Sequence, residues 1–139
     1  MMRYLLDTNT CIAVMRKHPQ VTQRMAAVSP DECAISSITS YELFTGIEKC
    51  SDPTKERAKV QLLLNTVHEL PFDDAAAAHA ANIRATLEQQ GQPIGPYDVL
   101  LAGHARSSGL ILVTANTREF TRVAGLTVEN WQNAPATSG

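Results

Sequence analysis

Short apolar runs alternate with longer segments of helical periodicity along this chain. The runs predict strands at residues 4–6, 33–36, 69–72, 110–114 and 126–128, of which the third and the last are the weakest. Strands that alternate with helices are typical of a parallel sheet covered by helices on both faces. The pattern therefore predicts an α/β fold with a central sheet of four to five strands. We expect a single domain over residues 1–133 and a mobile C-terminal tail at 134–139.

Helical spacing of apolar residues fills most of the intervening chain. The predicted helices cover residues 11–17, 21–28, 39–47, 55–67, 73–90 and 96–108, with a short helical turn near 117–120. Asp73 or Asp74 caps the long Ala-rich helix, and Gly91 ends it. Pro96 suits a first helical position, so Asp98 falls in the first turn of its helix, where the helix dipole favours a negative charge.

Several acidic residues lie at the ends of predicted strands or near the starts of predicted helices. Asp7 comes directly after the first strand, and Glu42 and Asp98 lie near the starts of two helices. Ligands of parallel sheets bind outside the carboxyl ends of the strands, where the strand order reverses. We therefore expect Asp7, Glu42 and Asp98 to converge on one rim of the sheet. Thr114 ends another predicted strand, and Asn116, just beyond it, joins the same rim.

Most of these residues also have a purely structural interpretation. Asp7 could cap the first helix, and Glu42 could be the capping-box partner of Thr39. Asp98 could be only a helix-start charge, and Glu119 a solvated or structural acid. Their joint placement, and not any one residue, favours a functional site. Asn116 would then act as a neutral ligand or hold a water molecule, with Asn9, Thr114 and Glu119 in supporting positions.

Clustered carboxylates repel one another, and without a cation at least one keeps its proton at a raised pKa. A hard divalent ion such as Mg²⁺ or Mn²⁺ removes this conflict, because it prefers oxygen ligands. Such an ion polarises a phosphoryl oxygen, lowers the pKa of a bound water and offsets the repulsion between an acidic pocket and a polyanion. The cluster therefore predicts metal-dependent hydrolysis of a phosphodiester, with Asp7, Glu42 and Asp98 as the metal ligands.

Composition limits the alternatives. The net charge of −2 at pH 7 argues against a strongly basic nucleic-acid binder. If nucleic acid is the substrate, metal ions or local basic patches must attract it. Arg84, Arg106, Arg118 and Arg122 could contact phosphates, although each could equally belong to a solvated helix face. The three cysteines and four histidines have neither disulfide nor zinc-ligand spacing, and we interpret His104 as structural.

The first apolar run is too short for a signal peptide or a membrane span, so we expect a cytoplasmic protein.

The order of several motifs resembles the PIN-domain ribonuclease family, and within it the VapC toxins of bacterial toxin–antitoxin pairs. The motifs are LDTN at 6–9, SITSYEL at 37–43 with Gly46, GPYD at 95–98, AGHA at 102–105, LVTANTREF at 112–120 and GLTVENW at 125–131. No single motif is specific, but their order and spacing are, and the similarity runs over residues 3–131.

The resemblance implies a PIN-like α/β/α sandwich in which Asp7, Glu42 and Asp98 bind Mg²⁺ or Mn²⁺ and a metal-activated water hydrolyses RNA. Members with this motif pattern are associated with cutting initiator tRNA in the anticodon loop. The resemblance also implies a homodimer and a cognate VapB-type antitoxin that blocks the site. Many PIN domains carry a fourth acid where this chain has Asn116, so the number of metals, one or two, stays open.

Two other functions stay open at this point. Asp7 could be the nucleophile of an aspartyl-phosphate phosphoryl transferase or phosphatase, although that chemistry usually needs a further acid two residues on, where Asn9 stands. The acidic cleft could instead belong to a non-catalytic module that receives an arginine side chain of a partner. A nuclease predicts growth arrest that Asp7→Asn relieves, whereas a binding module predicts no arrest.

Overall fold

Five short strands form one parallel sheet in the order β3-β2-β1-β4-β5. The computed structural model describes residues 1–133, so the predicted mobile tail at 134–139 lies outside the described residues. The strands are β1 (Tyr4–Leu6), β2 (Cys33–Ser36), β3 (His68–Leu70), β4 (Ile111–Val113) and β5 (Val128–Glu129). Strand β1 pairs with β2 on one side and with β4 on the other, both in parallel. The predicted parallel sheet is confirmed.

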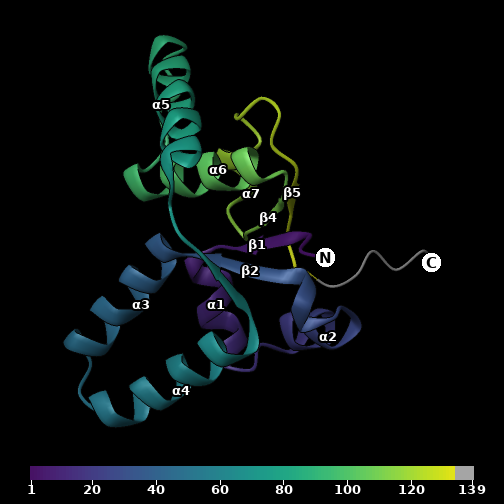
Figure 1. The fold of residues 1–139 in the computed structure, drawn as a ribbon, viewed down its shortest axis with the longest axis vertical. Helices are drawn as coiled ribbons and strands as arrows, with labels where there is room; N and C mark the ends of the chain where they lie inside the picture. Colours follow the sequence, from purple (N-terminus) through teal and green to yellow (C-terminus); the bar gives the residue numbers. More distant parts are fainter. Residues whose placement is uncertain (134–139) are drawn as a thin grey trace.

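Helices cover both faces of this sheet (Figure 1). On one side lie α1 (Thr8–Met15), α2 (Pro19–Ala27), α3 (Ser37–Lys49) and α4 (Pro53–Thr66). On the other side lie α5 (Asp74–Gln89), α6 (Pro96–Ser108) and the short α7 (Thr117–Phe120). A 3₁₀ turn, η1 (Pro30–Glu32), precedes β2. None of the helices within residues 1–133 is long and apolar enough to cross a membrane.

The sheet divides the hydrophobic core into two layers. Leu6 and Ile35 pack among α1–α4, whereas Leu5, Ala34 and Leu112 pack against α5, α6 and α7. All five side chains have no exposed area. Successive strand residues point to opposite faces, so a strand that is covered on both faces must be apolar at every position. This explains why the strands appear in the sequence as continuous apolar runs.

Four helices begin earlier than their sequence pattern predicts. Helices α2 and α4 begin at Pro19 and Pro53, and α1 and α3 begin early because each follows its strand without a loop. Helix α1 starts at Thr8, and its N-cap is Asp7, whose Oδ1 accepts a 2.7 Å hydrogen bond from the Thr10 amide. Helix α3 starts at Ser37, and its N-cap is Ser36, the last residue of β2. The capping-box interpretation of Glu42 with Thr39 is therefore wrong, since the cap lies three residues upstream of Thr39.

Helix α6 is fixed against α5 by an unusually close approach at Gly103. A Cβ atom at Gly103 would lie 2.5 Å from the Ala80 backbone nitrogen and 2.7 Å from the Ala80 Cβ. The other end of α6 closes at Gly109, which has a φ of +67° that suits glycine. Packing along the helix therefore determines where its first turn, with Asp98, lies relative to the sheet.

Candidate active site

The reversal of strand order falls between β1 and β4, so the expected crevice opens at the carboxyl ends of these two strands. The Asp7 amide donates a 3.0 Å hydrogen bond to the Val113 carbonyl, and the Thr10 hydroxyl donates a 3.1 Å bond to the same oxygen. These bonds tie the start of α1 to the end of β4. The Asp7 side chain is only 6% exposed, and one of its oxygens caps α1, as described above.

Glu42 is oriented by a residue from another helix. The Thr8 hydroxyl donates a 2.6 Å hydrogen bond to Glu42 Oε1, and the Thr39 hydroxyl lies 3.2 Å from the same Thr8 oxygen. Thr8 directly follows Asp7, so this bond holds Glu42 beside the first acid of the predicted cluster. The sequence pattern does not predict this role of Thr8, although Thr8 directly follows the acid at the strand end and opens α1.

Asp98 lies close to the carboxyl group of Glu119, which comes from α7. Partial burial, then the neighbouring Glu119 carboxyl group and the charges of Asp7 and Glu42, together raise the pKa of Asp98 to about 6. The structure therefore brings all four acids into one electrostatic environment. The raised pKa of Asp98 agrees with the repulsion expected between neighbouring carboxylates.

Asn116 and Glu119 complete the rim at the end of β4. The Asn116 amide donates a 2.9 Å hydrogen bond to the buried Thr114 hydroxyl, and Asn116 Nδ2 donates a 2.9 Å bond to Glu119 Oε2. Glu119 therefore bonds two members of the predicted set and is not merely a solvated acid. Asn9 differs from the rest: it is exposed, and no hydrogen bond found within residues 1–133 joins its side chain to the cluster.

The donor atoms of this cluster suit a hard cation. They are carboxylate oxygens and an amide oxygen, the ligands that Mg²⁺ and Mn²⁺ prefer. The nearby Cys11 thiol stays neutral, because burial, and then the charges of Asp7, Cys33 and Glu42, raise its pKa well above the usual value. Across the described residues, no three Asp, Glu, His or Cys side chains are gathered closely enough to form a ready metal site. Cation binding would therefore require the carboxylates to draw together.

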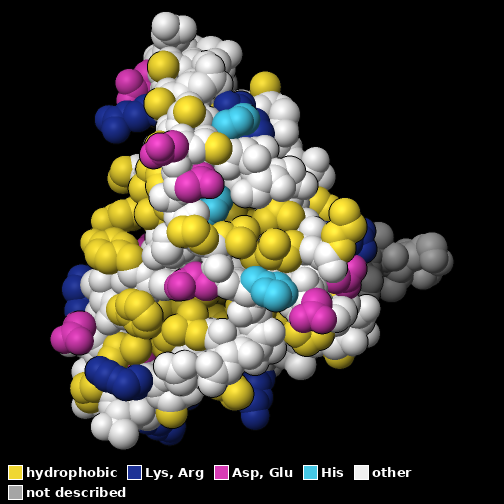
Figure 2. All heavy atoms as spheres, in the orientation of Figure 1, with side chains coloured by type: hydrophobic (Ala, Val, Ile, Leu, Met, Phe, Trp, Pro, Cys, Tyr) yellow, Lys and Arg dark blue, Asp and Glu magenta, His cyan; other side chains and the backbone are white. Residues whose placement is uncertain are grey.

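Three of the four candidate phosphate-binding arginines are engaged elsewhere. Arg106 donates to His79 Nδ1 at 2.9 Å and to Asn82 Oδ1 at 2.8 Å, which links α6 to α5. Arg84 pairs with Glu88, and Arg122 donates to the Pro93 carbonyl. The fourth, Arg118, is exposed on α7 next to Glu119. On the face shown in Figure 2, the Lys and Arg side chains stand apart from one another and do not form a continuous basic surface.

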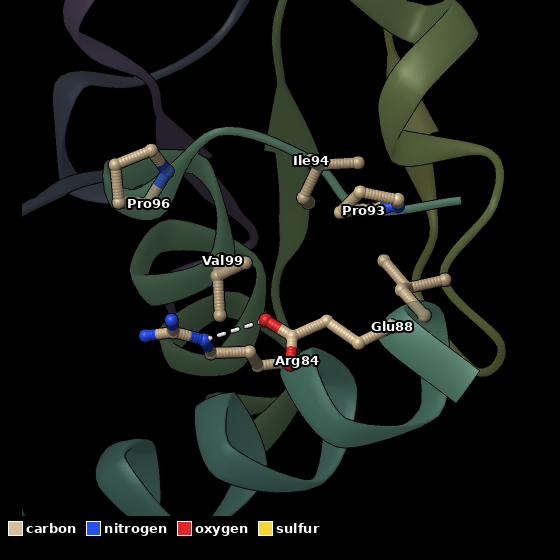
Figure 3. A pocket seen from close by; sticks show the side chains of 7 residues that line it. Arg84, Glu88, Pro93, Ile94, Pro96 and Val99 are labelled. Carbon is tan, nitrogen blue, oxygen red and sulfur yellow. Dashed lines mark hydrogen bonds and ion pairs between the residues drawn. The ribbon is translucent and has the colours of Figure 1, made fainter. Parts of the chain in front are cut away.

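A cavity of about 240 Å³ lies between the C-terminal end of α5, the following loop and the start of α6 (Figure 3). The Arg84–Glu88 ion pair lies on its α5 side, and Pro93 and Ile94 come from the loop. None of the acids of the cluster lines it. The cavity is therefore a feature separate from the acid cluster, although Val99, which lines it, directly follows Asp98.

The residues predicted to be structural behave as expected. His104 is 2% exposed, its Nδ1 lies 2.8 Å from the Ser36 hydroxyl, and the Phe72 ring meets it edge-on at 5.6 Å. Cys11, Cys33 and Cys50 are all free thiols. Of the two proposed caps of α5, Asp73 is the one that accepts the Ala76 amide.

Known proteins with the same sequence pattern share the whole of this architecture. The PIN domain family matches residues 4–126. The tRNA(fMet)-specific endonuclease VapC of Shigella flexneri is 44% identical over 131 residues, which cover 94% of this chain and 99% of that protein. Ribonuclease VapC2 of Haemophilus influenzae is 42% identical over 132 residues, with the same coverage. The crystal structure of DNA-bound VapBC from Salmonella typhimurium matches with a TM-score of 0.89 at 42% identity, over 94% of this chain and 99% of that one. The chain therefore belongs to the PIN-domain family and, within it, to the VapC ribonuclease toxins.

Proposed function

We propose that this chain is a metal-dependent endoribonuclease that cuts initiator tRNA in the anticodon loop. Two relatives, from Shigella flexneri and Salmonella typhimurium, are tRNA(fMet)-specific endonucleases and are 44% and 41% identical to this chain. The observation that supports the proposal is that the charges of Asp7 and Glu42, from two other elements, act on Asp98 beside the crevice between β1 and β4.

Asp7, Glu42 and Asp98 are the proposed ligands of Mg²⁺, for which Mn²⁺ can substitute. A bound divalent ion supplies a polarised phosphoryl oxygen and a water of lowered pKa. The chain's own residues prepare the site. Asp98 would have to turn from Glu119 to the ion, while the Thr10 amide and the Thr8 hydroxyl keep Asp7 and Glu42 oriented.

Asn116 is the proposed neutral member of the site, in the position where many PIN domains carry a fourth acid. Its Nδ2 donates to Glu119, which leaves its amide oxygen to accept a hydrogen bond from water or to contact an ion. Thr114 fixes the backbone of Asn116 through its hydroxyl. Glu119 supplies the additional negative charge that Asn116 lacks, and it is the candidate to support a second ion.

Aspartyl-phosphate chemistry at Asp7 has less support than hydrolysis. The Asp7 side chain is 6% exposed, and one of its oxygens is used to cap α1. A nucleophile in phosphoryl transfer needs a free oxygen in line with the phosphorus, and this environment restricts that approach. Absence of label on Asp7 after incubation with a phosphodonor is the expected result.

A cognate VapB-type antitoxin is the proposed partner. The related toxins from Salmonella typhimurium and Rickettsia felis were crystallised as VapBC complexes with DNA. An antitoxin arginine suits the acid cluster, because its guanidinium pairs with carboxylates through two parallel hydrogen bonds. Replacing that arginine by alanine should weaken inhibition of RNA cleavage, and unchanged inhibition would argue against this mode of blocking.

We also propose a homodimer, which sedimentation of the purified chain would test.

The experiment that tests the nuclease proposal is cleavage of total RNA by the purified chain with Mg²⁺, followed by mapping of the new 5′ ends. We expect one discrete cut in the anticodon loop of initiator tRNA, lost in excess EDTA and in Asp98→Asn. Asp74→Asn, which changes an exposed aspartate in the first turn of α5, is the matched control and should cut normally. Full activity of Asp98→Asn would remove the mechanism, and cuts in other RNAs alone would remove the tRNA assignment.

A further inference from the structure

Two tyrosines from different helices form an exposed pair beside the acid cluster. Tyr41 lies on α3 and Tyr97 on α6, and they directly precede Glu42 and Asp98 in the sequence. Their ring centroids are 5.8 Å apart with an interplanar angle of 45°, and their hydroxyl oxygens are 3.2 Å apart, within hydrogen-bond distance. The residues are 52% and 43% exposed. The two rings therefore contact each other, and residues 1–133 leave about half of their surface uncovered.

Core packing does not account for this pair. The chain has only three tyrosines, three phenylalanines and one tryptophan. Tyr4, Phe120 and Trp131 are almost completely buried and contribute to the hydrophobic core, as aromatic side chains usually do. Tyr41 and Tyr97 instead keep about half of their surface in solvent, at the one rim of the sheet where the acids gather. Their position points to a ligand with flat, uncharged surfaces.

We propose, on the basis of the nuclease function above, that Tyr41 and Tyr97 are positioning residues that stack against nucleobases of single-stranded RNA next to the cleaved bond. Aromatic rings bind bases of any sequence through their faces. A base inside a duplex already has both faces covered, so the pair selects an unpaired segment such as a loop. The substrate class at this position is thus single-stranded RNA, with its bases turned toward the tyrosines.

Stacking also solves a problem that the charges create. Four carboxylates surround the site and repel the phosphates of RNA, and the chain as a whole carries a net charge of −2. Contacts between rings and bases are little affected by this repulsion, because neither surface is charged. Since Tyr97 lies near enough to Glu42 to sense its charge, a stacked base would bring its own phosphate beside the cluster.

Steady-state cleavage of a single-stranded RNA oligonucleotide spanning the mapped cut tests this role. We expect Tyr41→Ala and Tyr97→Ala each to raise KM by roughly tenfold or more, with little change in kcat. Tyr→Phe at either position keeps the ring and should keep KM near the wild-type value. Tyr→Leu keeps apolar area without a flat ring and should behave like alanine. Leu62→Ala, at an exposed leucine of α4, is the matched control and should leave both parameters unchanged.

A second measurement reports stacking directly. The same oligonucleotide with 2-aminopurine next to the cleaved bond should lose fluorescence on binding wild-type protein in EDTA, and this quenching should disappear in the double alanine variant.

An unchanged KM in the alanine variants, or rescue by leucine equal to rescue by phenylalanine, would overturn the proposal. A shift in sedimentation of the alanine variants at unchanged KM would also overturn it and assign the pair to contact with a second copy. If wild-type protein cuts no RNA, the nuclease function itself fails. That result differs from failure of the stacking proposal alone, in which wild-type protein cuts RNA and the alanine variants do so with an unchanged KM.

Discussion

Thr8 and Glu42 are joined by a 2.6 Å hydrogen bond, although 34 positions separate them in the chain. The bond connects the first turn of α1 to the middle of α3 and fixes the direction of the Glu42 carboxylate. Replacing Thr8 by Val removes the hydroxyl at almost constant volume. We expect kcat for RNA cleavage to fall by about tenfold or more, since a hydrogen bond to a charged group is worth about 1.5–3 kcal/mol. Thr8→Ser should restore most of the rate, and wild-type kcat in Thr8→Val would show that Glu42 needs no such support.

Asp98→Asn should abolish cleavage without weakening the fold. The folded state disfavours the ionised form of Asp98, because partial burial and the neighbouring Glu119 raise its pKa to about 6. An uncharged amide avoids this cost at pH 7.5, so in EDTA the variant should melt at the same temperature as wild type or a few degrees higher. Mg²⁺ should raise the melting temperature of wild type only. A large loss of stability in the variant would contradict this account of the cluster.

Gly103 offers a test of the packing that fixes α6. In Gly103→Ala the new methyl group would lie 2.5–2.7 Å from backbone and side-chain atoms of Ala80, so α5 and α6 must separate. We expect the free energy of unfolding in urea to fall by about 1–3 kcal/mol. Gly46→Ala is the control, because that glycine lies exposed within α3 with nothing within 4 Å of a new Cβ. It should gain about 0.5–1 kcal/mol, the usual benefit of alanine over glycine in a helix.

His104 should make stability depend on pH. Burial lowers its pKa in the folded state, and the charge of Asp73 offsets this in part. The unfolded chain therefore takes up this proton more readily, so the stabilising contribution is complete above about pH 6.5 and is lost as the pH falls through the folded pKa. In urea unfolding between pH 8 and pH 5, wild type should lose more stability than His104→Asn. Parallel curves for the two proteins would show that His104 does not titrate differently on folding.

The three thiols should differ in reactivity. Burial raises the pKa of Cys33 to about 11 and that of Cys11 well above its usual range, so neither presents a thiolate near neutral pH. Cys50 is half-buried at the end of α3. Titration of the folded protein with a coloured disulfide reagent should modify one thiol quickly, and all three in guanidinium chloride. Cys50→Ser should remove the fast phase, and its persistence would place the reactive thiol elsewhere.

The strands were the most predictable part of the fold. A parallel sheet covered on both faces requires continuous apolar runs, and these are visible in the sequence around Leu5, Ile35 and Leu112. Helix starts were less predictable where a strand passes directly into a helix. There the cap is the residue at the strand end, Asp7 or Ser36, and no turn residues separate the two elements.

The acids of the site were predicted from their positions at strand ends and helix starts, but their partners were not. The bond of Thr8 to Glu42 and the pairing of Asp98 with Glu119 depend on distances between helices that the sequence does not specify. The same is true of the contact between Tyr41 and Tyr97. Helical periodicity identifies the face on which a side chain lies, whereas its neighbour across the crevice depends on how the helices pack.

Strand β1 is synthesised first, yet one of its two neighbours in the sheet is β4, near the other end of the chain. A ribosome that has not yet released residues 111–119 holds a polypeptide in which Asp7 and Glu42 have no Asp98–Glu119 pair fixed opposite them. The sheet cannot close around β1 until β4 has been synthesised. If these acids act as proposed, the growing polypeptide is harmless to the RNA that surrounds it until residues 111–119 have left the ribosome.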